Sequence, residues 1–504
     1  MGGGERKWAL RFRGKHGMIS TKEAVYLNDH NIPSDNELQN GGFDADGQGA
    51  SEAPAAEPDG YAPEPGTASD FDSGAADGAF AGGYAADESS PIDFDGGAAD
   101  DYLSDADCGA ADDYLSDADC GDADDEYYDE PLPEGEYTDV PRPKHKKKRP
   151  LAIRLLLLAG KLVLALVLIA AILAGGLIGY LTVTEYTPAH AENAQRGAVS
   201  VQQKLSGHSL RLLTLNTGYG GLGEEADFFM DGGSGVNPDD EKTVTYNMTG
   251  IECIFEDADA DVILLQEVDT DSARSFGRNQ WLQYEYDLKN YESRYALNYS
   301  CDYVPYPVTN PMGRMHSGLA TYSRYDISSA TRYSLPCPFT WPTRIANLKR
   351  CLLVTRIPIA NSEQELVVIN LHLEAYDDGE GKAAQTEQLL SLMREEYAKG
   401  NYVIAGGDFN QAFPGTTSRY PISEDSEWKP GLLDTLPDGW KYTYDDSAPT
   451  CRSLDAAYSD SSQLFVIDGY IVSPNVQVDR VKTLDEGFVY TDHNPVLLEV
   501  TLLQ

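Results

Sequence analysis

The sequence predicts a layered α/β or α+β domain over residues 208–504, preceded by one membrane-spanning helix at residues 162–183. Three observations carry this prediction. Short apolar, β-rich runs alternate with helical stretches after residue 207, a pattern typical of layered domains. A continuous apolar run lies at residues 162–183, and residues 34–140 are acidic and contain only scattered Phe and Tyr.

The chain begins with a short basic segment, residues 1–33, which is followed by a strongly acidic one. Residues 34–140 contain 32 Asp and Glu and no Lys, Arg or His, and their few aromatic residues cannot form a core that offsets the ordering entropy. We therefore expect this region to be disordered. Its twelve residues from Ala98 to Gly109 recur unchanged at 110–121. The repeat lacks the glycine turn and final Glu of a calcium-binding EF-hand loop, so tandem duplication of a solvated tail is the favoured interpretation.

The charge reverses at residues 141–161, a basic segment directly before the apolar run. About 20 apolar residues suffice to cross a bilayer as a helix, and Arg154 and Lys161 can extend their charged ends to the interface. The run lies too far from the N-terminus to favour a removable signal peptide. The positive-inside rule then predicts a single-pass protein of the cell membrane, with a cytoplasmic N-terminus and an extracellular C-terminal domain. The acidic tail would meet a cytoplasmic partner that the sequence does not identify.

After the apolar run, residues 184–207 are polar and are predicted to be a linker. The domain that follows, residues 208–504, contains one clear amphipathic helix from Ala383 to a C-terminal Gly400. Its strands are predicted at eight runs: LRLLTLN, DVILLQEV, SGLATYSR, CLLVTRI, ELVVINLHL, YVIAGGDFN, LFVIDGYIVS and HNPVLLEVTL.

Charge and cysteine content narrow the function classes. Residues 188–504 carry 46 acidic and 24 basic side chains, a balance of −22, which disfavours tight non-specific binding to nucleic acid unless cations bridge the charges. The domain contains five Cys, so at least one thiol lacks a partner within it, and the sequence does not assign pairs. No Cys-x-x-Cys or Cys/His cluster indicates zinc.

Polar side chains end several of the predicted strands, where burial is costly unless something is bound. Each has an ordinary explanation alone, because GGDFN is a plausible turn and a lone His is more often a satisfied core residue. Gathered at one rim, however, a set with four carboxylates is stable mainly around a cation. The set comprises Asn216, Glu267, His372, Asp408, Asn410, Asp468, Asp492 and His493.

In their order along the chain these motifs resemble the endonuclease/exonuclease/phosphatase superfamily. The resemblance runs from LTLN through QEV, SGLATYSRYDI, INLHL, GGDFN and IDGYIVS to TDHNPV, and so covers nearly all of residues 208–504. GDFN and TDHNPV are its most specific parts. The resemblance implies a four-layer α/β sandwich, in which two mixed β-sheets pack face to face with helices outside.

The resemblance also implies a metal site. Glu267 would be the principal ligand, with Asn216 beside it and Asp492 near the same ion. Such an all-oxygen set suits Mg²⁺, a hard ion held by few carboxylates, and the same ligands accept Mn²⁺ or Ca²⁺. Whether one or two metals act stays open.

By the same resemblance, His493 paired with Asp468 would be the acid/base, and Asp408 would orient or deprotonate the attacking water. Asn410 would donate a hydrogen bond to the phosphate, and His372 would bind phosphoryl oxygens or assist the leaving group. The implied reaction is in-line attack of water at phosphorus.

Two features depart from the family pattern. Gly469 stands where the family often has a larger residue after the catalytic Asp, and the Gly-rich segment from Tyr219 to Lys242 matches no family signature. Because that segment follows Asn216, we expect it to overhang the site. Arg314 and His316 are further candidate phosphate contacts, although a surface Arg and a packing His are the ordinary explanation.

The predicted function is divalent-metal-dependent hydrolysis of a phosphate ester by a phosphodiesterase, nuclease or phosphatase. The substrate could be a nucleic acid, a phospholipid head group in the adjacent membrane or a soluble phosphate ester. Tethering to the membrane favours lipid by raising its effective concentration. The alternative is a non-catalytic surface module that retains the fold for binding or scaffolding.

Overall fold

A computed structural model describes residues 150–503, except residue 378. The predicted basic N-terminus, the acidic region with its repeat, and residues 141–149 of the basic segment lie outside the described residues. The described helices are α2 (Leu151–Val183), α3 (Glu241–Ala258), α4 (Gln280–Asp287) and α5 (Glu380–Ala398).

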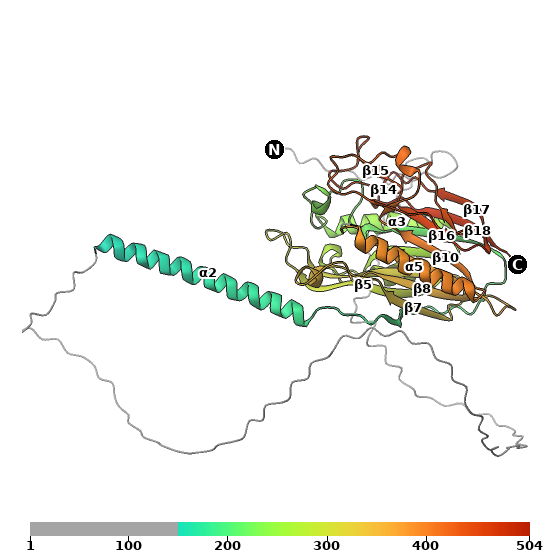
Figure 1. Cartoon of the computed structure of the whole chain (residues 1–504), viewed down its shortest axis with the longest axis horizontal. Coiled ribbons are helices and arrows are strands. Elements are labelled where there is room, and N and C mark those ends of the chain that lie inside the picture. The colour runs from blue at the N-terminus through green and yellow to red at the C-terminus, as the bar shows by residue number, and fades with distance from the viewer. Residues whose placement is uncertain (1–149, 378, 504) are drawn as a thin grey trace, which may run out of the picture. The chain divides into compact units, whose positions relative to one another are not determined.

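Two seven-stranded mixed sheets form the centre of the domain (Figure 1). The first sheet has the order β1 (Ala191–Asn193), β7 (Ser329–Ser334), β8 (Cys351–Pro358), β9 (Glu365–His372), β10 (Tyr402–Asp408), β16 (Asp468–Val472) and β13 (Lys441–Thr443). The second has the order β17 (Val476–Thr483), β18 (Val496–Leu502), β3 (Ser209–Asn216), β4 (Val262–Asp269), β6 (Gly313–Ser323), β5 (Glu292–Val304) and β2 (Gln195–Arg196). Two short pairs complete the strands: β11 (Gln411–Ala412) with β12 (Gly431–Leu432), and β14 (Cys451–Arg452) with β15 (Leu464–Phe465).

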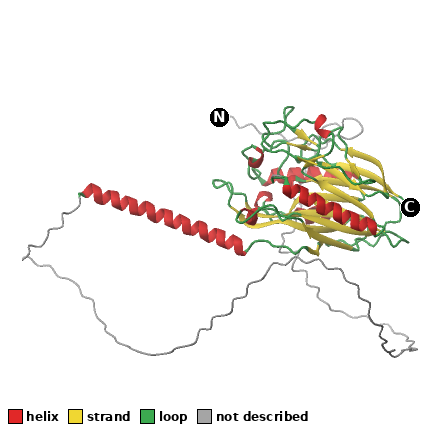
Figure 2. Cartoon of the chain, viewed as in Figure 1, coloured by secondary structure: helices red, strands yellow, loops and turns green. Residues whose placement is uncertain are grey.

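The sheets pack face to face, and helices cover their outer faces, as Figure 2 shows. Between the sheets, side chains such as Leu264 of the second sheet and Val368 of the first share one buried cluster. Met248 of α3 packs on the outside of the second sheet, and Leu389 of α5 packs on the outside of the first. This confirms the predicted four-layer sandwich. The four layers follow from strands whose apolar side chains point to both faces of each sheet, because each face must then be covered by another layer.

The predicted amphipathic helix is α5, which ends just before Gly400, where a positive φ of 88° turns the chain into β10. The predicted membrane segment lies within α2, whose 33 residues have a mean hydropathy of 2.8 in their most apolar part. By length and composition α2 can cross a membrane. It begins at Leu151, before the predicted start at residue 162, because the residues from Leu151 onward are also apolar.

The segment expected to be a linker contributes two edge strands. β1 pairs antiparallel with β7 at the edge of the first sheet, and β2 pairs antiparallel with β5 at the edge of the second. The domain therefore begins within a few residues of the end of α2. Short, polar edge strands of this kind carry too weak a hydrophobic alternation to be recognised in the sequence.

Candidate active site

The first sheet places three predicted residues side by side. β9 and β10 run parallel and end in register at His372 and Asp408, while β16 begins opposite Asp408 at Asp468. The close approach of β10 to β9 requires glycine at Gly407, whose φ is +152° and where a Cβ would meet the Leu371 carbonyl. The GGD sequence is therefore a structural requirement for placing Asp408.

The second sheet supplies Asn216 and Glu267 at the ends of neighbouring parallel strands. Asn216 is the last residue of β3, and Glu267 lies near the end of β4, where the pairing with β6 shifts register between Leu265 and Val268. The bulge holds Glu267 at a φ of +54°, a left-handed conformation that is unusual for a residue with a side chain. Strained backbone of this kind often marks a functional position.

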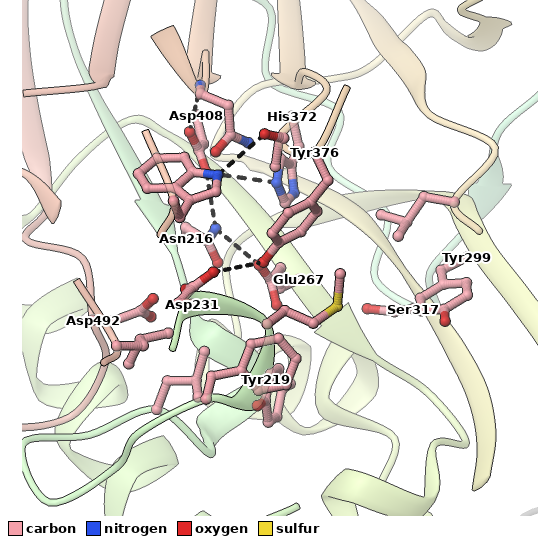
Figure 3. A pocket seen from close by; sticks show the side chains of 18 of the residues that line it. Asn216, Tyr219, Asp231, Glu267, Tyr299, Ser317, His372, Tyr376, Asp408 and Asp492 are labelled. Carbon is pink, nitrogen blue, oxygen red and sulfur yellow. Dashed lines mark hydrogen bonds and ion pairs between the residues drawn. The ribbon is translucent and has the colours of Figure 1, made fainter. Parts of the chain in front are cut away.

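Asn216 connects the two sheets at the site. Its side-chain amide donates to Glu267 Oε1 at 3.2 Å and to Asp408 Oδ2 at 3.1 Å, as drawn in Figure 3. Its own Oδ1 accepts from the Gly218 backbone N–H at 3.1 Å. Asn216 therefore faces the carboxylates with its amide nitrogen and fixes the orientation of both.

His493 and Asp468 form a buried pair. His493 Nδ1 lies 2.8 Å from Asp468 Oδ2, and its Nε2 lies 3.8 Å from both Asp408 Oδ2 and Asp492 Oδ2. Burial alone would lower the pKa of His493, but the carboxylate of Asp468, aided by Asp492, holds that pKa well above its ordinary value. The raised pKa favours the imidazolium form of His493, whose Nε2 lies close to two carboxylates.

Asp408 and Asp492 resist ionisation. Burial, and then the charge of Asp468, raise the pKa of Asp408 to about 7, and burial with the charge of Glu267 also raises the pKa of Asp492. Asp408, Asp468 and His493 bring ligand atoms within 4.8 Å of one another, as do Cys451, Asp492 and His493. Carboxylates that lie this close together repel one another. A divalent cation bound among their oxygen atoms would offset that repulsion.

His372 is neutral. Burial, with the nearby Arg350 guanidinium, lowers its pKa well below the ordinary value, and its Nε2 lies 3.5 Å from Asp408 Oδ2. Its Nδ1 is buried and has no hydrogen-bond partner. A buried ring nitrogen without a partner is uncommon in a folded protein and marks His372 as a candidate functional residue.

These residues line one pocket of about 370 Å³. The predicted residues that line it are Asn216, Glu267, His372, Asp408, Asn410, Asp492 and His493, with Asp468 behind His493. The side-chain amide of Asn410 donates to the Leu373 carbonyl at 2.9 Å, and its φ of +50° suits the left-handed turn after Asp408.

The structure does not bring Arg314 or His316 to this pocket. Arg314 pairs with the exposed Asp271 at 2.7 Å, and His316 Nδ1 lies 2.5 Å from the Thr270 hydroxyl. Both residues precede the strand run SGLATYSR, at the start of β6. β6 runs antiparallel to β4, so its first residues lie beyond the end of β4 and not beside Glu267.

Some residues of the pocket were not predicted. The segment after Asn216 borders the pocket and supplies Asp231, which is labelled in Figure 3. The Tyr376 hydroxyl donates to Asp231 Oδ1 at 3.2 Å across the pocket. Burial, and then the charge of Asp492, raise the pKa of Asp231 to about 7. Neither residue ends a strand, so the strand-end criterion could not find them.

Arg274 is a basic residue of the pocket lining, and the sequence also did not reveal it. It forms two hydrogen bonds to Asp269, at 3.0 and 3.1 Å, and its Nη1 lies 3.7 Å from Glu267 Oε2. Its guanidinium also lies over the Tyr219 ring, 3.7 Å from the centroid. Arg274 and Asn216 thus lie at different carboxylate oxygens of Glu267.

The five Cys of the predicted exterior domain are all free thiols.

A model of the endonuclease/exonuclease/phosphatase family matches residues 229–493, just over half of the chain. No curated protein matches the sequence.

Among solved structures, an endonuclease/exonuclease/phosphatase from Beutenbergia cavernae shares 17% identity at a TM-score of 0.41, covering 59% of this chain and 72% of its own. Truncated TDP2 from Caenorhabditis elegans shares 17% identity at a TM-score of 0.37, covering 59% and 99%. An endonuclease/exonuclease/phosphatase from Bacteroides vulgatus shares 15% at 0.38, covering 58% and 99%.

Proposed function

The chain belongs to the endonuclease/exonuclease/phosphatase family and is a hydrolase acting on phosphate esters, and from this premise we propose that its reaction depends on a divalent metal, most simply Mg²⁺. The observation that supports this proposal is the concentration of carboxylates with raised pKa values around one pocket, whose arginines Arg274 and Arg350 are already paired with Asp269 and Glu374. A cation bound there would offset their repulsion.

In the proposed site, Glu267 and Asp492 hold the metal, and Asn216 orients Glu267 through its amide. When bound, the metal would supply a positive charge that stabilises the negative charge growing on the phosphoryl oxygens. Glu267 fits this role because Asn216 and Arg274 fix it from two sides while its strained backbone directs it into the pocket.

The remaining steps belong to the chain's own side chains. Asp408, with a pKa of about 7, accepts a proton from the attacking water near neutral pH. His493, held as an imidazolium by Asp468, donates a hydrogen bond from Nε2 to the phosphoryl group as charge accumulates. Neutral His372 contributes its Nε2, which lies beside Asp408, to the phosphate or the leaving group.

We also propose that α2 anchors the chain in the cell membrane and that residues after Val183 lie outside. The support is the length and hydropathy of α2, together with the basic residues concentrated before it. The basic flank would remain in the cytoplasm with the acidic N-terminal region.

Hydrolysis of bis-p-nitrophenyl phosphate tests the proposed reaction. We expect the purified chain to release p-nitrophenol with Mg²⁺, to stop with EDTA, and to recover when Mg²⁺ is restored. Glu267→Gln, which keeps the side-chain length but removes its charge, should raise the Mg²⁺ concentration needed for half-maximal rate. The matched control is Glu499→Gln, at a partly exposed position on β18 away from the pocket. A folded chain without metal-dependent turnover would favour the non-catalytic scaffold.

A further inference from the structure

The C-terminal end of α2 packs directly against the catalytic domain. Leu181 is 5% exposed and, with Leu177, joins an apolar cluster of the domain. The Tyr180 hydroxyl donates to Asp302 Oδ2 at 2.7 Å, and Trp341 Nε1 donates to the Thr182 hydroxyl at 3.1 Å. The domain is therefore attached at the end of α2 by side-chain contacts and does not hang on a free tether.

An ionic contact fixes the same junction. Glu185, two residues after α2, accepts two hydrogen bonds from Arg344, at 2.9 and 3.0 Å, and lies 3.2 Å from Lys349. The side chain of Glu185 is only 5% exposed. Partly buried, bidentate pairs of this kind are better ordered than surface pairs.

The membrane boundary lies at this junction. The 22 residues from Leu162 to Val183 span roughly 33 Å at about 1.5 Å per residue, which matches a hydrocarbon core of about 30 Å. Lys161 marks the opposite end of that span. Tyr180 and Trp341 then lie at the depth where aromatic side chains prefer the lipid–water interface.

The apolar cluster that receives α2 is also one wall of the active-site pocket. Ten residues belong both to the pocket lining and to the cluster containing Leu177 and Leu181, among them Phe228, Phe229, Val304, Met312, Ala346 and Leu348. The same pocket is also lined by the carboxylates of Glu267, Asp408 and Asp492 and by His493. The pocket is therefore amphiphilic, with its apolar side continuous with the membrane helix.

The loop between β5 and β6, residues 305–312, exposes apolar side chains next to this wall. Tyr306 lines the pocket and is 59% exposed, its ring 5.4 Å from that of Phe229, and Val308 is 86% exposed. Trp341, on the loop that contacts α2, is 54% exposed. Exposed apolar residues beside an apolar pocket wall, with Trp341 in contact with the end of α2, indicate contact with lipid.

We propose that the pocket takes its substrate from the bilayer, and that this substrate is a phospholipid whose phosphodiester reaches the carboxylate side while its apolar part lies along the shared wall. This inference rests on the proposed phosphoesterase function. Water adds to phosphorus, and the bond to the oxygen of the lipid backbone breaks. That oxygen leaves with a proton, so the products are a neutral membrane alcohol and a water-soluble phosphomonoester.

The charge distribution favours a lipid over a nucleic acid. The domain carries a balance of −22, and the two basic residues at the junction, Arg344 and Lys349, are already paired with Glu185. A polyanionic strand needs free Lys and Arg along its backbone. The same acidity favours a zwitterionic head group over an anionic one.

The test uses the full chain reconstituted with Mg²⁺ in vesicles of phosphatidylcholine and sphingomyelin. Released phosphocholine is compared with turnover of bis-p-nitrophenyl phosphate by the same vesicles. We expect both reactions, and we expect glycerophosphocholine, the same phosphodiester without acyl chains, to be hydrolysed much more slowly than the lipid.

Val308→Asp probes the lipid contact. Because Val308 is exposed, the substitution should leave the folding of the chain unchanged. It should lower the ratio of lipid turnover to soluble-ester turnover about tenfold, the equivalent of losing one buried Val side chain. The matched control is Tyr286→Ser on α4, which is 74% exposed and outside the pocket lining, and which should keep the ratio.

Two failures are distinguishable. Absence of soluble-ester turnover would overturn the proposed function and the lipid inference with it. Soluble-ester turnover without phosphocholine release, or faster hydrolysis of DNA or RNA than of lipid, would overturn the lipid inference alone. An unchanged ratio in Val308→Asp would also contradict it.

Discussion

His493 shows how one residue's surroundings define its chemistry. Its Nδ1 is held by Asp468 at 2.8 Å, and its Nε2 faces the pocket. We expect His493→Ala to lower kcat on bis-p-nitrophenyl phosphate by about 10²–10⁴-fold, the usual contribution of a positioned acid/base group. His316→Ala is the matched control, because His316 lies outside the pocket lining. Equal losses in the two variants would contradict the role of His493.

Asp231 gives the stability of the metal-free chain a pH dependence. Its pKa in the folded chain is about 7, against an ordinary 3.8, because burial and then Asp492 oppose its charge. The folded state therefore holds this proton more tightly than the unfolded state. The stabilisation is complete below about pH 4 and is lost as pH rises through about 7.

The corresponding variant is Asp231→Asn, which can still accept the hydrogen bond from Tyr376. Without metal, it should raise the free energy of unfolding at pH 8 by about 1–3 kcal/mol and have little effect at pH 4, as measured by chemical denaturation. Asp239→Asn, at an exposed position in the same segment, should have little effect at either pH. A destabilised Asp231→Asn at pH 8 would refute this explanation.

At the scale of elements, the strand ends could be predicted and the segments between them could not. Asn216 and Asp408 end strands that have parallel neighbours, and Asp468 begins a strand that pairs antiparallel with β10, so the pairing brings such strand ends to one edge of each sheet. Asp231 and Tyr376 lie in segments without periodicity, whose path is determined by packing across the pocket. The strands β1 and β2 were expected to be linker for the same reason.

Gly407 tests whether β10 places Asp408 through its close contact with β9. Gly407→Ala should destabilise the chain by about 1–3 kcal/mol and lower kcat, because the added Cβ meets the Leu371 carbonyl and moves Asp408. Gly415→Ala is the control, since Gly415 also has a positive φ but no atom lies near its added Cβ. Thermal unfolding and turnover measured together would show the difference, and equal effects of the two substitutions would argue against the contact.

At the scale of the whole molecule, the site forms only because the two sheets pack together and bring residues of both into contact. The amide of Asn216 joins Glu267 of the second sheet to Asp408 of the first, and a second bridge, from Gln266 Nε2 to Asn370 Oδ1 at 2.8 Å, lies behind it. The motif order predicted the four-layer fold, but the docking of α2 depends on side chains far apart in sequence, such as Tyr180 and Asp302. No local pattern marks that contact.

A crystal structure with Mn²⁺ and inorganic phosphate tests the central claim most directly. We expect one strong anomalous peak between the carboxylates of Glu267 and Asp492, with the phosphate in hydrogen-bond reach of His493 Nε2. Mn²⁺ bound only outside this pocket, or phosphate bound away from His493, would contradict the claim that the two sheets converge to hold a metal against a phosphate.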